Sequence, residues 1–431
     1  MPGTDTAQLG KMFADLARRH GVPAAQLSLH GDGRAIDVTA GDVDSDAKFP
    51  VGSITKTFTA SLAMLLVADG DLDLDDPVGA HLPELGTEVD SLGGRLTLRQ
   101  ILSHTSGLPS SLDERSDAAS STRQYLRDCR ELALVQPPGS GFTYSNVGYV
   151  LIGRMVEEIT GMSWWDAVEA LLLKPLGVEP SFTVRPGARD SFVPGHAVNE
   201  TSGRAVAVAQ TIRAVEAACG ALALSAKDLV RFGLAHLAGS APLDPDVCQD
   251  MRRPVAGAEP FGLADGWGLG WAVFRGADGD WAGHDGNADG TSCRLRVDPA
   301  HDRVVALTTN SGTGSALWDE LVYELRSRDI PVGHYALPEL NEQIPLPGNM
   351  FGSYRNGDVE YVVDGPDGDT ASLAVNGERY QDLALHEGWL FSVREPASGR
   401  RILGGRFLGD SSTGQVSGIQ TGGRVAGRRK P

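Results

Sequence analysis

A serine and a lysine three positions apart carry the first chemistry that this sequence suggests. Ser53 and Lys56 lie in FPVGSITKTFTASLAMLLVADG, residues 49–70, where a glycine precedes a long apolar segment that predicts a helix. On such a helix the two side chains share one face. An alkoxide forming at the helix N-terminus would meet free backbone N–H groups, and a lysine in a dry cleft could take the serine proton as a neutral amine. The pair is therefore a candidate nucleophile and base.

The same spacing also has a simpler interpretation. Ser53 could cap the helix while Lys56 is solvated. Ser45 and Lys48 repeat the spacing in the polar stretch GDVDSDAKFP, where no apolar helix would hold them still. The spacing alone therefore does not establish a catalytic pair.

Two further motifs could complete an acyl-transfer site. In GFTYSNVGYV, Tyr144 and Asn146 stand at a loop-to-helix boundary. There a phenol could shuttle a proton to the serine, and an amide could bond both the lysine and a substrate. In WAGHDGNADGTSC, His284 and Gly286 share one face of a predicted strand, and the missing side chain at Gly286 would let a substrate backbone approach.

The elements that must position these residues follow an order typical of one α+β domain. A helix is predicted over residues 7–19, a hairpin over 25–40, mostly helical segments over 70–235, strands at 268–274, 292–298 and 303–310, and a helix at 315–328. Strands from both ends would form one antiparallel sheet with flanking helices, and a helical lobe would be inserted between them. The site is expected in a cleft between sheet and lobe.

A second, smaller unit is predicted after the catalytic domain, which we place at residues 1–330. Residues 331–348 contain several prolines and predict a linker. Short strand patterns separated by Gly, Asp and Asn turns predict a small barrel-like β domain over residues 349–431. Within it Tyr354 and Asn356 repeat the Tyr-x-Asn spacing, in a place that we expect to be remote from the cleft.

Composition restricts the class of partner. The chain has 431 residues and a formal net charge of -18, so its field would repel a phosphate backbone, and nucleic acid is not an expected partner. Residues 394–431 differ, with eight basic against two acidic residues. That stretch would suit an acidic partner, although a solvated basic tail also explains it.

The sequence gives no sign of metal chemistry or of a membrane. The four cysteines are widely spaced, which indicates neither a disulfide framework nor a metal site, and no cofactor is expected. No apolar segment has the length of a membrane span, and no export signal is found. These features predict a cytoplasmic protein.

The chain resembles the serine penicillin-binding-protein and class C β-lactamase superfamily in the order of its motifs: Ser-x-x-Lys, then Tyr-x-Asn, then Lys or His with a glycine two residues on. LTLRQILSHTSGLP, PPGSGFTYSNVGYVLIGRMVEEITG and CGALALSAKDLVRFG are also similar to that superfamily, and the resemblance extends over about residues 45–330. It implies an α+β fold with a class C β-lactamase-like antiparallel sheet, followed by a small lipocalin-like β domain.

The resemblance also implies a mechanism. Ser53 would attack a carbonyl, Lys56 and Tyr144 would share the base role, and Tyr144 would then hand a proton to the leaving group. The backbone N–H groups of Ser53 and Asn287 would bind the oxyanion. Removing one such donor costs roughly 2.7–4 kcal/mol of transition-state stabilisation.

The third motif departs from the Lys-Thr-Gly of many relatives. Here His284, Asp285 and Gly286 stand in its place, so a substrate carboxylate would lose a hydroxyl donor and could meet an anion. Hydrolysis of ordinary β-lactams is therefore not expected, and His284 would instead steady Tyr144 or a leaving group. His104, in SHTSG, is expected to be a structural histidine of a turn.

With its extra β domain and expected location, the chain looks most like trans-acting penicillin-binding-protein-type thioesterases, which release and cyclise nonribosomal peptides. This implies a peptidyl thioester substrate with a D-residue at the acyl position, possibly presented by an acidic carrier protein, and head-to-tail cyclisation by the peptide's own amine. Two alternatives stay open. One is a hydrolase of the same class: an esterase, a D-amino-acid peptidase or amidase, or a β-lactamase-like enzyme. The other is a non-catalytic binding protein, which the intact motif residues disfavour.

Overall fold

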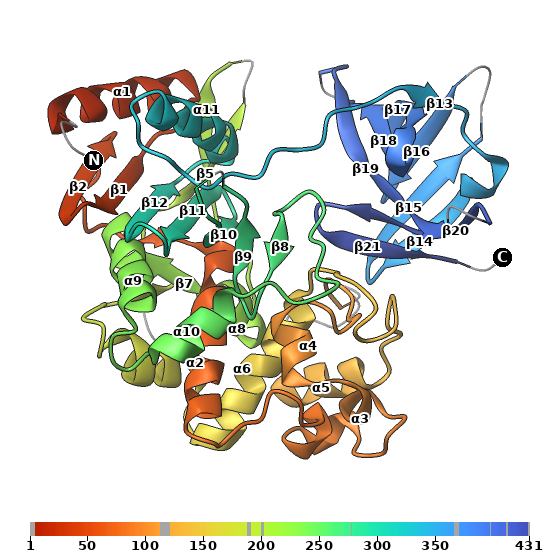
Figure 1. The fold of residues 1–431 in the computed structure, drawn as a ribbon, viewed down its shortest axis with the longest axis horizontal. Coiled ribbons are helices and arrows are strands. Elements are labelled where there is room, and N and C mark those ends of the chain that lie inside the picture. Colours follow the sequence, from red (N-terminus) through yellow and green to blue (C-terminus); the bar gives the residue numbers. More distant parts are fainter. Residues whose placement is uncertain are drawn as a thin grey trace.

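One antiparallel sheet of seven strands organises the N-terminal domain (Figure 1). Its strand order is β2-β1-β12-β11-β10-β9-β8, so strands from both ends of the domain pair directly, as predicted. The structure, a computed structural model, describes residues 5–112, 121–187, 191–199, 202–276, 278–365, 370–396, 398–410 and 413–429. The strands of this sheet are β1 (Ala25–Gly31), β2 (Arg34–Ala40), β8 (Gly266–Trp267), β9 (Ala272–Phe274), β10 (Trp281–Ala288), β11 (Thr291–Asp298) and β12 (Arg303–Thr309).

Helices cover both faces of this sheet. α1 (Thr6–Arg19) and α11 (Gly314–Arg326) pack together on one face, and α9 (Ala226–Ala238) packs against β1, β11 and β12 on the other. Every residue of β11 is therefore buried. α9 begins at the capping box of Ser225 and ends at Gly239, whose left-handed conformation stops the helix.

The predicted helical lobe lies between the two sets of strands. Its central helix is α2 (Thr55–Ala68), which is buried nearly all round, and α6 (Asn146–Thr160) packs beside it. The hydroxyl of Ser145 caps the start of α6, and Gly161 ends it. The other helices and strands between β2 and β8 are β3 (Phe49–Pro50), α3 (Leu92–Arg95), α4 (Leu98–Leu102), α5 (Thr122–Arg130), α7 (Trp164–Ala167), β4 (Ser181–Phe182), β5 (Gly195–Asn199), β6 (Arg204–Val208), α8 (Ala217–Gly220), β7 (Leu222–Leu224) and α10 (Pro245–Arg252).

One strand is shorter than its sequence pattern suggests. The apolar run over residues 268–274 predicts a continuous strand, but only the segment from Ala272 pairs as β9. Gly270 adopts φ 84° and bends the chain toward α2, where a side chain at this position would meet Ala60. Close packing against the central helix therefore overrides the strand pattern.

Eight antiparallel strands form a closed barrel in the C-terminal domain. They run up and down in sequence order from β14 to β21, and pairing of β14 with β21 closes the ring. This is the lipocalin-like architecture that was predicted, and aromatic side chains such as Tyr354, Phe391 and Phe407 fill its interior. The strands are β14 (Gly352–Asn356), β15 (Val359–Asp364), β16 (Ala371–Val375), β17 (Glu378–His386), β18 (Leu390–Arg394), β19 (Arg401–Asp410), β20 (Gln415–Thr421) and β21 (Arg424–Arg428), and β13 (Gln343–Ile344) adds to β17.

The barrel packs directly against the catalytic domain. The Gln420 side chain donates to the Glu259 carbonyl at 3.1 Å, and the Gly423 N–H donates to the Phe261 carbonyl at 2.7 Å. Figure 1 shows β21 directed toward the catalytic domain. The domain boundaries at residues 330 and 349 stay a prediction, although β13, inside the predicted linker, already pairs with the barrel.

The sequence predicted no membrane span, no disulfide framework and no metal site. No helix in the described parts of the chain combines the length and the apolarity that crossing a membrane requires. All four cysteines are buried free thiols. Within the described ranges, no three His, Cys, Asp or Glu side chains are grouped as metal ligands.

Candidate active site

Ser53 lies in a tight turn that leads into α2. Residues Gly52–Ile54 form one turn of 3-10 helix, and α2 begins at Thr55, so Lys56 follows in the first turn of the α-helix. Lys56 Nζ lies 3.1 Å from Ser53 Oγ, which is hydrogen-bonding distance. The sequence therefore predicted the contact between these two side chains correctly, and their roles as nucleophile and base stay a prediction.

The Lys56 amine is held in a site without a carboxylate. Its side chain is fully buried, and Nζ donates a second hydrogen bond to the Cys219 carbonyl at 2.9 Å. Nζ also lies 5.1 Å from the ring centre of Tyr144 and 5.7 Å from that of Tyr149. Among the described residues no Asp or Glu pairs with it. This surrounding orients the amine toward Ser53 and excludes water from it.

Two glycines let β10 pack against the Ser53 turn. A Cβ at Gly52, whose φ is 51°, would lie 2.3 Å from the Asn287 carbonyl oxygen, and a Cβ at Gly286 would lie 1.9 Å from the Val51 carbonyl oxygen. Gly286 was expected to admit a substrate backbone, and that contact stays a prediction. What the structure shows is that Gly286 admits the protein's own turn and so brings Asn287 beside Ser53.

Some of the predicted site residues line one cavity of about 320 Å³, whereas Lys56, Tyr144, His284 and Gly286 are not part of its wall. Ser53, Asn146 and Asn287 contribute to its wall, which fits an oxyanion site formed by the Ser53 and Asn287 N–H groups, although that pairing stays a prediction. The hydrogen bond expected from Asn146 to Lys56 is absent among the described residues, and that expectation is corrected. The other lining residues are Gly52, Gln210, Thr211, Ile212, Glu216, Cys219, Gly220, Ala288 and Asp289.

Tyr144 lies above Lys56 and has a free hydroxyl. Its ring centre is 4.3 Å from that of His104, 5.9 Å from that of Trp267 and 6.2 Å from that of His284. The phenol oxygen is buried and has no hydrogen-bond partner in the described part of the chain. It does not bond Ser53 in this structure, and the proton shuttle through Tyr144 stays a prediction.

His284 is held as a neutral hydrogen-bond acceptor. Its Nδ1 lies 2.6 Å from the Asp285 carbonyl oxygen, which can only accept, so Nδ1 carries the proton and Nε2 has the free lone pair. Burial, assisted by the charge of Lys56, lowers the pKa of His284 to about 3. His284 contacts Tyr144 by ring packing, and no hydrogen bond joins them in the described structure.

Asp285 points away from the cleft. Its carboxylate pairs with Arg296 at 2.6 Å and with Arg294 at 3.3 Å, on the opposite side of β10 from Ser53. Burial alone would raise the pKa of Asp285, but the two guanidinium charges lower it below its ordinary value. The sequence placed Asp285 on this face correctly. The concern that a substrate carboxylate would meet its charge is corrected, because the charge is already neutralised.

Three buried histidines should make the protein less stable in mild acid. Burial lowers the pKa of His104, His236 and His284 in the folded protein, whereas unfolded histidines titrate near 6.5. Below pH 6.5 the unfolded chain therefore binds more protons, and the free energy of unfolding should fall with decreasing pH by up to about 1.4 kcal/mol per pH unit for each histidine.

Urea unfolding between pH 8 and 4.5 measures this effect. Carboxylates whose pKa is lowered, such as Asp285 and Glu169, lose their contribution mainly below their ordinary values of 3.8 and 4.5, so they do not account for a slope at pH 5 to 6.5. His236→Phe removes one buried imidazole and should reduce the slope by about a quarter to a third, because burial also lowers the pKa of His334. A free energy of unfolding that is constant from pH 6.5 to 4.5 would show that the histidines are protonated in the fold.

His104 is structural, as expected, and it supports the Tyr144 segment. It adopts φ 56° in its turn, and its Nδ1 accepts a hydrogen bond from the Ser145 N–H at 3.1 Å. Its ring packs against Tyr144 and Tyr149. Sequence reasoning identified the turn but not the contact with the candidate tyrosine.

The two repeated motifs have different outcomes. Lys48 pairs with Asp228 at 2.5 Å, and Ser45 accepts a hydrogen bond from Lys227 at 2.7 Å. This copy of Ser-x-x-Lys therefore makes structural contacts. Asn356 was expected to be remote from the cleft, and this was wrong. Its side chain contacts the residue before Tyr144, because the barrel docks there.

Sequence reasoning missed Arg424 as a residue of the site. It is the first residue of β21, and its guanidinium lies 5.2 Å from the ring centre of Tyr144. No carboxylate of the described chain pairs with it. The only signal was the excess of basic residues over 394–431, which could not indicate that one of them reaches the Tyr144 ring.

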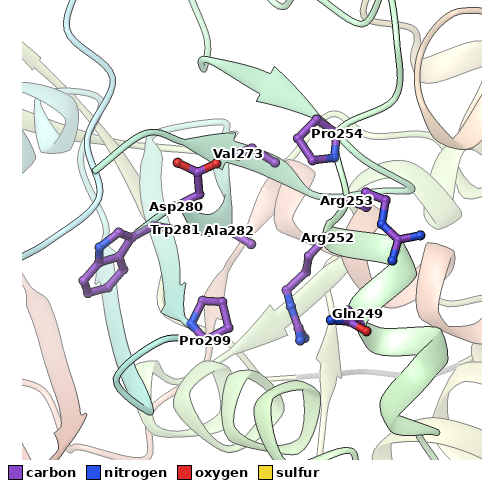
Figure 2. A pocket seen from close by; sticks show the side chains of 9 residues that line it. All are labelled: Gln249, Arg252, Arg253, Pro254, Val273, Asp280, Trp281, Ala282 and Pro299. Atoms are coloured by element: carbon purple, nitrogen blue, oxygen red, sulfur yellow. The ribbon is translucent and has the colours of Figure 1, made fainter. Parts of the chain in front are cut away.

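A second cavity of about 280 Å³ lies between α10 and the strands β9 and β10 (Figure 2). Arg252 and Gln249 border it from the helix, and Trp281 and Pro299 border it on the other side. The Arg252 guanidinium donates to the His236 carbonyl at 2.7 Å. None of the predicted site residues lines this cavity, so it does not belong to the cleft.

Comparison with known proteins identifies the family. A family profile described as Beta-lactamase matches residues 9–326, which include the sheet, the helical lobe and the cleft. The chain belongs to this family. Penicillin-binding protein 4 of Amycolatopsis lactamdurans is a similar protein. It is 33% identical to this chain over 347 residues, which are 74% of this chain and 89% of that protein.

Solved structures extend the likeness beyond the β-lactamase-family domain. A crystal structure of a protein called SurE is similar at 39% identity and a TM-score of 0.88, over 98% of this chain and 99% of SurE. SurE with D-Leu is similar over the same shares with a TM-score of 0.85. A D-stereospecific amidohydrolase from Streptomyces sp. is 27% identical with a TM-score of 0.62, over 73% of this chain and 98% of its own. The SurE likeness therefore includes the barrel, whereas the amidohydrolase likeness covers a smaller share of this chain.

Proposed function

We propose that this β-lactamase-family chain is a serine acyltransferase that takes a peptidyl thioester onto Ser53 and releases the peptide by head-to-tail cyclisation. The family and the solved relatives give it a serine hydrolase fold. The observation that carries the proposal is the 3.1 Å contact between Ser53 Oγ and the buried Lys56 amine at the wall of the cleft. A buried amine at that distance can act as the base for a serine nucleophile.

The proposed reaction has two balanced steps. Ser53 Oγ attacks the thioester carbonyl and gives its proton to Lys56 or Tyr144, the C–S bond breaks, and the thiol leaves with that proton. The peptide's terminal amine then attacks the resulting ester, the C–O bond breaks, and Ser53 recovers a proton. An amine tethered to the acyl group has a high effective molarity and outcompetes water.

A D-residue at the acyl position is supported by the relatives rather than by a contact. One structure of SurE contains D-Leu, and the Streptomyces amidohydrolase is described as D-stereospecific. Both proteins share the fold of this chain across the cleft-bearing domain. We therefore extend the D-preference to the residue that this chain would bind beside Ser53.

The basic C-terminal stretch is a candidate docking site for an acidic carrier of the thiol. Arg394 and Arg401 pair with Asp382, and Arg406 lies 3.3 Å from Glu259, so much of the basic C-terminal stretch is neutralised within the protein. An acidic carrier protein stays a proposed partner, and the chemistry does not depend on it. A cytoplasmic location is likewise part of this proposal.

One product analysis tests the proposal. Purified protein is given a synthetic peptide thioester with a D-residue at its C-terminus and a free N-terminal amine, and mass spectrometry separates cyclic from linear product. Cyclic peptide should be the main product, because the tethered amine competes with water for the acyl-enzyme. The N-acetylated peptide should give only linear acid, since its amine is blocked.

The same product analysis distinguishes hydrolysis from cyclisation. A hydrolase of the same class is favoured by the likeness to the amidohydrolase, and it would give linear acid from both peptides. Linear acid alone from the free-amine peptide therefore overturns cyclisation and keeps the acyl-enzyme. A thioester with an L-residue should react more slowly than its D-counterpart in either case.

A further inference from the structure

We propose that Asn356, in the first strand of the barrel, is a positioning residue for Tyr144. Its buried amide joins the barrel to the two segments of the catalytic domain that hold the tyrosine in the cleft. The inference rests on the proposed acylation of Ser53 and not on cyclisation. The inference gives the barrel a role in the reaction, although side chains fill the interior of the barrel.

The Asn356 amide makes hydrogen bonds with most of its donor and acceptor groups at the interface between the two domains. The side chain is 1% exposed, and its Oδ1 accepts from the Ser110 N–H at 2.7 Å. Its Nδ2 donates to the Val425 carbonyl at 2.8 Å and to Thr143 Oγ1 at 3.4 Å. A buried amide with partners on three segments fixes their relative positions, because each lost bond would leave a polar group unsatisfied.

Ser110 and the strand that carries Val425, both bonded to Asn356, also belong to the segments that hold the backbone of Tyr144. The Tyr144 N–H donates to the Gly423 carbonyl at 2.9 Å, in the turn between β20 and β21. The Tyr144 carbonyl accepts from Ser110 Oγ at 3.1 Å. Thr143 Oγ1 also accepts from the Val425 N–H at 3.1 Å. Both backbone groups of Tyr144 are thus tied to the barrel, one directly and one through Ser110.

The turn after Asn356 continues the same contact. A Cβ at Gly357 would lie 2.5 Å from the Ser111 carbonyl oxygen, so only glycine allows this approach without a shift. Ser111 Oγ donates to Asp358 Oδ1 at 2.5 Å. The end of β14 and the turn that follows it are therefore fitted to the loop that carries Ser110.

The position of the Tyr144 hydroxyl depends on this support because no hydrogen bond holds the hydroxyl itself in the described structure. The phenol oxygen has no hydrogen-bond partner among the described residues, so its position follows from ring packing and from its backbone. Misplacement of a catalytic group by about 1 Å can cost about 100-fold in rate. Loss of the Asn356 amide should therefore impair acylation by displacing this hydroxyl.

A double-mutant cycle tests the role of Asn356. The assay follows acylation of Ser53 by a p-nitrophenyl ester in single-turnover experiments, with the release of p-nitrophenol and intact-protein mass as readouts. Asn356→Ala should lower the acylation rate constant about 10- to 100-fold with tyrosine at position 144, and less than about twofold in the Tyr144→Phe background. The ester concentration giving half the maximal rate should change less than about twofold in both, since binding is not the affected step.

A matched control separates positioning from general damage to the barrel. Tyr354→Phe, two residues earlier in the same strand, removes a buried hydrogen bond to the Met350 carbonyl that stays within the barrel. It should lower the thermal midpoint and leave acylation within about twofold. If Asn356→Ala does not fold, Thr143→Val is tested in the same cycle, because it removes the hydroxyl that receives Asn356 and Val425 while keeping the side-chain volume.

The results distinguish this inference from the proposed function. Equal losses with tyrosine and with phenylalanine at position 144, or a loss no larger than that of Tyr354→Phe, would overturn the role of Asn356 while leaving the nucleophile in place. No acylation of Ser53 by ester or thioester in the unaltered protein would instead overturn the proposed function itself. The two failures therefore give different data.

Discussion

Replacing Ser53 by alanine should abolish formation of the acyl-enzyme and lower turnover of a peptide thioester by at least about 10⁴-fold. Ser53 Oγ is the one serine oxygen within reach of the buried Lys56 amine in the described structure, and no neighbouring hydroxyl can replace it. Alanine removes only an oxygen from a turn fixed by Gly52 and β10, so the fold should be retained. Intact-protein mass after mixing with the thioester is the measurement.

The chain supplies a matched control for this variant. Ser45 has the same spacing to a lysine but accepts a hydrogen bond from Lys227 in an exposed stretch. Ser45→Ala should keep both the acyl-enzyme mass and the rate within about twofold, because surface changes of this kind are usually small. An adduct of unchanged mass and rate in Ser53→Ala would move the nucleophile to another residue and remove the basis of the proposed function.

Replacing Lys56 by methionine should lower the rate of acylation by about 10²- to 10⁴-fold, which is the contribution typical of a positioned base. Methionine fills the buried site without an amine, so Ser53 keeps its turn but loses the group that takes its proton. The Cys219 carbonyl would also lose a donor, at a cost of about 1–3 kcal/mol in the free energy of unfolding. Rapid-mixing kinetics with the thioester, normalised to folded protein, measure the effect.

Lys48→Met is the corresponding control. Lys48 is the other lysine of a Ser-x-x-Lys pair, and its ion pair with Asp228 supports the start of α9. Its loss should lower stability and leave the acylation rate per folded molecule within about twofold. A Lys56→Met protein that acylates at nearly the unaltered rate would assign the first proton transfer to Tyr144 instead.

The sequence predicted the core of the site because that chemistry is local. Ser53 and Lys56 are three residues apart on one helix, and the helix determines their contact. The alternation of β10 likewise placed His284 and Asp285 on opposite faces, as the Arg294 and Arg296 pairing shows. The sequence also predicted that strands from both ends of the domain share one antiparallel sheet, although it did not give their order.

The rest depends on contacts between distant segments, which no local pattern encodes. Asn146 has the predicted place in the cleft, but Lys56 bonds the Cys219 carbonyl instead, 163 residues along the chain. Arg424 and Asn356 reach the Tyr144 segment only because the barrel docks on it. A Tyr-x-Asn spacing could not distinguish an interface residue from a chance repeat, since the docking surface has no periodicity.

The docking of the barrel on the Tyr144 segment also means that a new chain completes the support of Tyr144 only late in its synthesis. Val425, which bonds Thr143, is 282 residues further along the chain. At the usual pace of synthesis, about 5–20 residues per second, the ribosome takes on the order of tens of seconds to make that stretch. Throughout this interval Tyr144 lacks the contacts that the barrel makes with its segment. A nascent chain should therefore be acylated more slowly than the complete protein until the last strand of the barrel has been made.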